Sequence, residues 1–153
     1  QMNNFAYQYG DPEVIDRSAS IGNRFEPGKR PMSTMTPIII FDENNELKLI
    51  TGSPGGALIP AAVLRLVTGV IDFNLNLGEA TMLPRLHKDW PYKNLRLEKG
   101  FSKDTLQILE SYGHELEESK TMGSTQSILI SSKGKEGFAD LRRPNAGVAI
   151  QID

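Results

Sequence analysis

The chain has 153 residues, of which 39% are hydrophobic and 24% charged, the balance of an ordinary globular protein long enough to bury a core. Its formal net charge of -2 argues against a nucleic-acid partner, because phosphate binding requires a basic excess on at least one face. The absence of cysteine excludes disulfides, thiolate metal sites and a cysteine nucleophile. No stretch approaches the roughly 18 apolar residues of a membrane span, and the length predicts a single domain.

Residues 1–35 are predicted to form an extended segment, since turn-forming residues interrupt them throughout. Inside a compact domain, so long a stretch without periodic structure indicates a lid or a segment that packs against a missing partner. Gln1 opens the chain without an initiator methionine or a signal peptide. We therefore expect a piece of a longer protein, and a surface arm of a complete small protein is the alternative.

Two hairpins are expected, each from two short runs that are separated by a turn. The first pairs residues 37–41 with 47–50, and the second pairs 126–131 with 136–141. Between the hairpins, residues 95–98 alternate in polarity like a strand.

A long helix is predicted over residues 58–73, which directly follow the first hairpin. Only Arg65, Thr68 and Asp72 interrupt its apolar character, and they fall on one stripe of the helix surface. We therefore expect the rest of this helix to be buried, packed against a sheet.

Two further helices are expected. A short one over residues 76–83 stops before Pro84, which cannot continue a helix, and Ser102 is a suitable N-cap for another over 103–112. Helices together with hairpins predict an α+β fold, in which residues 36–153 form a layered core of sheet and helix.

Between the first hairpin and the apolar helix lies the sequence TGSPGGA, residues 51–57. The adjacent Gly55 and Gly56 leave backbone N–H groups unscreened at a helix N-terminus, a place that favours negative charge. Such a turn can hold a carboxylate, a phosphate or the oxyanion of acyl transfer. A tight turn that needs glycine for its backbone is an equally weighted alternative. Ser53 lies outside the nucleophile-elbow pattern, because Pro54 follows it.

Three hydroxyls, those of Ser33, Thr34 and Thr36, precede the first hairpin. Paired hydroxyls suit a carboxylate ligand, since each donates one hydrogen bond, although composition alone favours ordinary turn capping. His87 and His114 lack the spacing of metal ligands, so no metal site is expected. From the residues alone we expect ligand binding near the glycine turn and no specific reaction.

Five motifs nevertheless resemble, in order and spacing, the small subunits of γ-glutamyltranspeptidases. They are KRPMSTMTP (29–37), TGSPGG (51–56), EATMLPRLH (79–87), LRLEKGFS (95–102) and MGSTQSI (122–128). The resemblance extends over essentially the whole chain. It implies part of an αββα N-terminal-nucleophile hydrolase sandwich, made by autocleavage of a precursor into a large and a small subunit.

In that family a threonine at the new N-terminus of the small subunit attacks a γ-glutamyl amide such as that of glutathione. Water or an acceptor amine then takes the acyl group. The resemblance further implies no metal or organic cofactor, a large subunit as partner, and a periplasmic or secreted location.

The resemblance also assigns roles to individual residues. Gly55 and Gly56 match the oxyanion-hole pair, and Ser33 matches the first of two hydroxyl residues that hold the substrate α-carboxylate. Thr34 replaces the usual second serine but keeps a hydroxyl, and Gln1 matches a residue that contacts the substrate α-amino group.

Three departures from the family pattern limit the expected activity. The nucleophilic threonine would precede Gln1, so this chain alone is expected to be inactive as the C-terminal portion of a small subunit. Asn4 stands where the family has an aspartate that pairs with the α-ammonium, and the lid-like region carries Ile15, Ala19 and Ser20 in place of an aromatic and a glycine pair. There are therefore two alternatives: a related amidase of the glutaryl-cephalosporin acylase type, and a non-catalytic binding fragment.

Overall fold

The computed structural model describes residues 4–6, 21–89 and 92–149, and divides the chain into two units. Gln1–Thr34 form the first unit and Met35–Asp153 the second. We treat each unit by itself, and the expectation of a single domain stays a prediction.

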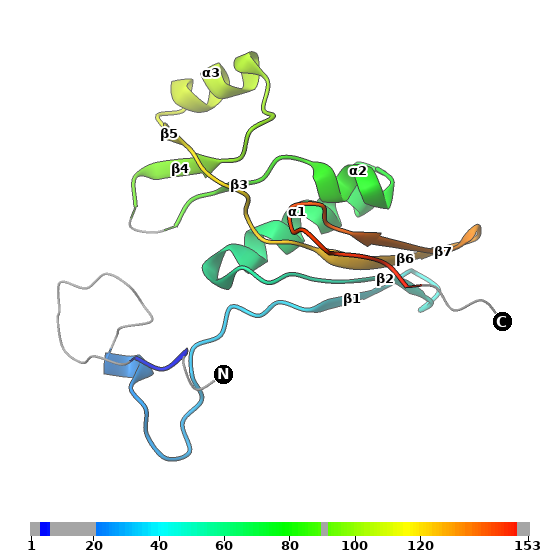
Figure 1. The fold of residues 1–153 in the computed structure, drawn as a ribbon, viewed down its shortest axis with the longest axis horizontal. Helices are drawn as coiled ribbons and strands as arrows, with labels where there is room; N and C mark the ends of the chain where they lie inside the picture. The colour runs from blue at the N-terminus through cyan, green and yellow to red at the C-terminus, as the bar shows by residue number, and fades with distance from the viewer. Residues whose placement is uncertain (1–3, 7–20, 90–91, 150–153) are drawn as a thin grey trace. The chain divides into compact units, whose positions relative to one another are not determined.

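The second unit is built on a four-stranded antiparallel sheet with the order β1-β2-β6-β7 (Figure 1). Its strands are β1 (Ile38–Phe41), β2 (Leu47–Gly52), β6 (Gln126–Ser131) and β7 (Gly134–Ala139). β1 and β2 form one hairpin and β6 and β7 the other, as the sequence predicted, and the two hairpins join through the pairing of β2 with β6.

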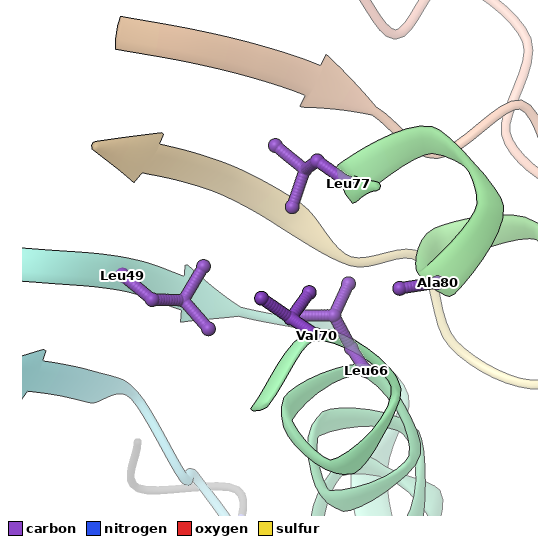
Figure 2. Close-up of a cluster of buried hydrophobic side chains, with 5 residues drawn as sticks. All are labelled: Leu49, Leu66, Val70, Leu77 and Ala80. Atoms are coloured by element: carbon purple, nitrogen blue, oxygen red, sulfur yellow. The ribbon is translucent and has the colours of Figure 1, made fainter. Parts of the chain in front are cut away.

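Helices α1 (Ile59–Ile71) and α2 (Leu77–Met82) cover one face of this sheet (Figure 1). Strand residues Ile40, Leu49 and Leu129 are register neighbours and therefore share that face. Leu49 meets the helices in the buried core, which is drawn in Figure 2 and comprises Leu49, Leu66, Val70, Leu77 and Ala80. Alternation along the strands thus directs one row of apolar side chains into the core.

The opposite face of the sheet is also apolar. Ile39 pairs with Ile50, and Ile50 pairs with Ile128, so these three side chains form a row across the strands. Ile39 is 60% exposed and Ile128 is 44% exposed. A row of exposed isoleucines is typical of a sheet face that another layer covers in the complete protein.

The expectation that α1 is buried outside its polar stripe is wrong. Its buried positions, Ala62, Val63, Leu66 and Val70 among them, lie on one face, whereas Leu64 is 62% exposed. Phe73, just beyond the helix, is 68% exposed. The reason is that an all-round apolar helix needs partners on both sides, and the described residues supply the sheet and α2 on one side only.

The other two helices are short, and the second of them begins at the cap that the sequence predicted. α2 starts with a capping box in which Asn76 accepts from the Glu79 backbone N–H, and it ends at Leu83, directly before Pro84. α3 (Lys103–Ser111) begins at Ser102, whose hydroxyl accepts from the Thr105 backbone N–H at 3.4 Å.

A second sheet has the order β3-β4-β5, with β3 (Leu86–His87), β4 (Asn94–Leu97) and β5 (Glu115–Glu118). β4 was expected, whereas β3 and β5 were not. β3 has two residues, and the sequence Glu-Leu-Glu-Glu of β5 contains one apolar residue, so neither carries a strand pattern. α3 connects β4 to β5, which lie parallel.

Candidate functional site

The glycine turn connects the end of β2 to a short 3₁₀ turn, η4 (Gly56–Leu58), that leads directly into α1. Gly55 has a φ of 144° and Gly56 a φ of 59°, conformations that side-chain-bearing residues rarely adopt. The Leu58 N–H donates to the Gly55 carbonyl at 3.2 Å, which closes the turn. Both glycines are exposed.

Ser53 holds this turn together from within. Its hydroxyl donates to the Pro54 carbonyl at 2.7 Å and accepts from the Ser124 backbone N–H at 2.9 Å. Two residues before Ser53, the hydroxyl of Thr51 lies 2.8 Å from that of Ser127, and both side chains are buried. The Ser53 hydroxyl therefore contributes to the geometry of the turn.

A buried ionic cluster lies behind this region, and sequence reasoning did not find it. Arg85 pairs with Asp140 at 2.6 Å, and Arg142 pairs with Glu98 at 2.7 Å. Arg142 also contacts Asp140 at 3.2 Å, which joins the two pairs into one cluster. All four side chains are buried, and the two positive and two negative charges balance.

The cluster draws together three of the motifs that carry the family resemblance. Arg85 lies in the motif EATMLPRLH (79–87), Glu98 in LRLEKGFS (95–102) and Met122 in MGSTQSI (122–128). Arg85 donates to the Met122 carbonyl at 2.6 Å, while Glu98 accepts from the Met122 N–H at 2.5 Å. The presence of Arg85 and Glu98 in these motifs was the only sequence signal for the cluster. No spacing rule could connect its members, because they are far apart along the chain.

The cluster stabilises the charges of Asp140 and Arg142. Burial raises the pKa of Asp140, but the Arg142 backbone N–H and the charge of Arg85 outweigh this, so that the pKa lies below its usual value. Burial lowers the pKa of Arg142, and the hydrogen bond and charge of Glu98 reverse this and raise the pKa above its usual value. For Arg85, burial and the charge of Arg142 lower the pKa. Asp140 is therefore held in its ionised form.

In the first unit, a network around Asn23 links Asn4 to Met32, the residue before the hydroxyl pair. The Asn23 amide donates to the Asn4 carbonyl at 2.7 Å, and its amide oxygen accepts from the Met32 N–H at 2.8 Å. Asn4 itself donates to the Met32 carbonyl at 3.2 Å. Asn4 thus contacts Met32, the residue directly before Ser33. Ser33 is exposed, and Thr34 is half-buried.

Other predicted site residues cannot be placed in the same way. Gln1 and the lid positions Ile15, Ala19 and Ser20 lie outside the described residues. Gly55 and Gly56 belong to the second unit, whereas Asn4, Ser33 and Thr34 belong to the first. Asn23 was not singled out by sequence reasoning, since a lone asparagine in a turn-rich stretch carries no distinctive signal.

Residues 4–6, 21–89 and 92–149 contain no group of three or more histidine, aspartate or glutamate side chains that could hold a metal ion. Among the helices of these same ranges, none has both the length and the hydrophobicity needed to cross a membrane.

The antiparallel sheet, the helices on one of its faces and the glycine turn that joins them define part of an N-terminal-nucleophile hydrolase sandwich, the fold that the sequence predicted. γ-Glutamyltranspeptidase from Helicobacter pylori superposes with a TM-score of 0.80 and 35% identity, over 93% of this chain and 78% of that one. A cephalosporin acylase from Bacillus halodurans gives a TM-score of 0.76 and 26% identity, over 86% of this chain and 25% of that one.

A family profile described as γ-glutamyltranspeptidase matches residues 1–150. The glutathione hydrolase proenzyme of Escherichia coli is 43% identical over 135 residues, which are 88% of this chain and 23% of that protein. The chain belongs to the γ-glutamyltranspeptidase family, and the suspected resemblance is confirmed. It spans about a quarter of the length of the curated relatives that it matches.

Proposed function

We propose that this chain forms part of an enzyme that transfers or hydrolyses γ-glutamyl groups, with glutathione and related γ-glutamyl amides as substrates. The observation that carries the proposal is the exposed Gly55–Gly56 turn at the start of a helix, with both residues in backbone conformations that favour glycine. Family membership supplies the reaction class, and the turn supplies the chemistry that the class requires.

In this reaction a threonine hydroxyl attacks the γ-glutamyl carbonyl carbon. The C–O bond that forms turns the carbonyl oxygen into an oxyanion, and backbone N–H groups of the glycine turn stabilise its charge. Collapse of this intermediate breaks the C–N bond, and the proton from the threonine goes to the leaving amine. Water or an acceptor amine then releases the acyl group by the same steps in reverse order. Loss of one oxyanion donor typically lowers the rate by ~10²–10³.

Substrate recognition falls to the first unit. Ser33 and Thr34 donate hydrogen bonds to the α-carboxylate of the γ-glutamyl group, and Gln1 contacts its α-amino group. The fixed position of Asn4 beside Met32 supports a role for Asn4 at the α-amino group as well. These assignments carry the family motif onto residues of the matching type.

The nucleophilic threonine and the strands that follow it lie on a part of the protein outside this chain, so the chain alone is inactive. The isoleucine row of Ile39, Ile50 and Ile128, of which Ile39 and Ile128 are exposed, supports this proposal, because an αββα sandwich buries that sheet face under a second sheet. The partners are accordingly the remainder of the small subunit and the large subunit. The location that the family suggests is periplasmic or secreted.

A second candidate, an acylase for acyl groups that lack an α-amine, is favoured by Asn4. An amide keeps a hydrogen bond to the α-ammonium but supplies no charge, and a charged hydrogen bond contributes about 1.5–3 kcal/mol. Asn4 also donates to the Met32 carbonyl, which an ionised aspartate cannot do. The similarity to a cephalosporin acylase is consistent with this alternative.

Release of a chromogenic aniline by the complete processed protein separates these proposals. The experiment compares γ-glutamyl with glutaryl anilides, for the wild type and for Asn4→Asp. We expect preference for the γ-glutamyl donor, raised roughly 10- to 100-fold in kcat/KM by Asn4→Asp. Asn44→Asp, which adds the same charge at an exposed position in the β1–β2 turn, is the matched control.

Each outcome has a distinct meaning. Glutaryl turnover equal to or better than γ-glutamyl turnover assigns the acylase function instead. Failure to turn over either donor overturns the enzymatic proposal, as does N-terminal sequencing of the intact small subunit that finds no threonine at its start. Acyl transfer by this chain in isolation would contradict the proposed location of the nucleophile.

A further inference from the structure

The segment Met122–Thr125 lies directly against the glycine turn, although about 70 residues separate the two in sequence. Gly123 has a φ of 70°, and a Cβ built on it would lie 2.8 Å from the Ser53 hydroxyl and 3.2 Å from the Pro54 carbonyl. A Cβ on Gly55 would in turn lie 3.3 Å from the Gly123 Cα. The two backbones are therefore in contact, with glycine required on both sides.

The buried ionic cluster holds this segment at both ends. At Met122, Glu98 accepts from the N–H and Arg85 donates to the carbonyl, at 2.5 Å and 2.6 Å. At Thr125, the backbone N–H donates to Asp140 at 2.9 Å, and Arg85 donates to the Thr125 hydroxyl at 3.2 Å. Arg85 is thus a direct partner of both ends of the segment.

Between these two ends, the segment contacts the turn through one hydrogen bond and one steric contact. The hydrogen bond runs from the Ser124 N–H to the Ser53 hydroxyl, and the steric contact is that of Gly123 with Ser53 and Pro54. The cluster makes the segment rigid, because its buried side chains are paired with one another and have few alternative arrangements.

We propose that Met122–Thr125, fixed by Arg85, Glu98 and Asp140, is a positioning element that sets where the Gly55 and Gly56 backbone donors point. The proposal rests on the proposed acyl-transfer function and assigns Gly123, Ser53 and Arg85 as positioning residues for its oxyanion site. None of the three contacts the reacting atoms. Oxyanion donors act only when aimed at the place where charge develops, and displacement by about 1 Å can lower a rate ~10²-fold.

The first test is Gly123→Ala in the complete processed protein, with Gly113→Ala as matched control. Gly113 has a φ of 83°, close to that of Gly123, but a Cβ on it would meet nothing within 4 Å. Both variants therefore impose similar backbone strain, and only Gly123→Ala pushes on the turn. We expect kcat of Gly123→Ala to fall roughly 10- to 100-fold with KM within about twofold, and kcat of Gly113→Ala to change less than about twofold.

The second test is Ser53→Ala, which removes the coupling hydrogen bond with little steric change and so remains informative if Gly123→Ala fails to fold or to process. The substitution also removes the hydrogen bond from the Ser53 hydroxyl to the Pro54 carbonyl. Because two neutral hydrogen bonds are lost, we expect kcat to fall roughly 5- to 100-fold at unchanged KM. Arg85→Lys should retain more kcat than Arg85→Met, because lysine keeps the positive charge. Its kcat should still lie below that of the wild type, because lysine lacks the guanidinium fork that reaches both ends of the segment.

The outcomes separate this proposal from the function on which it rests. A wild-type protein that releases aniline from neither donor overturns the acyl-transfer function, and the positioning role falls with it. An active wild type whose kcat is unchanged by both Gly123→Ala and Ser53→Ala overturns the positioning role alone. Equal losses of kcat in Gly123→Ala and Gly113→Ala, which reflect general destabilisation, also overturn it.

Discussion

Replacement of Asp140 by asparagine should strongly destabilise the second unit. The Asp140 side chain is fully buried and accepts from Arg85, from the Thr125 backbone N–H and from Arg142. Asp140→Asn leaves Arg85 and Arg142 with Glu98 as their one counter-charge. It also places an NH₂ group, which is a hydrogen-bond donor, beside these cations. Breaking a buried pair by removal of one partner costs about 3–5 kcal/mol. In a complete protein of the length of the curated relatives, which is about four times that of this chain, 1 kcal/mol corresponds to about 1 °C, so Tm should fall by roughly 3–5 °C.

Thermal unfolding of the complete processed protein, followed by circular dichroism, measures this change. The matched control is Asp89→Asn, because Asp89 also pairs with a cation, Arg96, but its side chain is 37% exposed. A surface pair contributes about 0–1 kcal/mol, so the control should lower Tm by less than about 1 °C. Equal shifts in Tm for the two variants would refute the structural role of the cluster.

The same variant should change the response to acid. The folded-state pKa of Asp140 lies below its usual value, so the unfolded chain binds this proton at a higher pH than the folded chain does. The contribution of Asp140 to stability is therefore complete above its unfolded pKa of about 3.9 and is lost as pH falls through the lower, folded pKa. Below about pH 4, Tm of the wild type should decline more steeply than that of Asp140→Asn. Parallel acid limbs in the two proteins would contradict this reasoning.

Three further variants test the core, a cap and the first unit. Leu66→Ala should cost about 2–5 kcal/mol in the free energy of unfolding, because Leu66 is fully buried, whereas Gln107→Ala at an exposed polar position of α3 should have little effect. Asn76→Ala should cost about 0.5–2 kcal/mol through loss of the capping box at α2, and urea unfolding of both proteins would measure this. Asn23→Ala should raise KM for γ-glutamyl donors roughly fivefold with kcat unchanged, since Asn23 holds Asn4 beside Met32; an unchanged KM would reject that role.

The sequence predicted those elements whose signals are local. Both hairpins follow from short runs broken by polar turns, and Ser102 marks the start of α3 through its own hydroxyl. Burial was harder to predict, as Leu64 shows, because an apolar residue is buried only where another layer is present to cover it. Whether that layer exists is a property of the whole assembly and leaves no trace in the periodicity of one helix.

The ionic cluster could not be predicted for a different reason. Arg85, Glu98 and Asp140 are separated by 13 to 55 positions, and each alone resembles an ordinary surface charge. They meet because β4, the end of α2 and the end of β7 converge on the Met122–Thr125 segment. Only the fold places them together, since hydrogen bonds at such separations follow no sequence spacing rule.

The contacts of the glycines bear on the choice between a simple tight turn and an oxyanion site. A tight turn requires glycine for its backbone conformation alone, and Gly56, whose Cβ position is open, fits that explanation by itself. Gly55 and Gly123 have an additional constraint, because a side chain on either would push two backbone segments apart. One of these segments is anchored by a buried cluster whose charges are expensive to bury. A loop that merely reverses the chain needs no such anchor, whereas the oxyanion donors that we propose, which must point at one position in space, do.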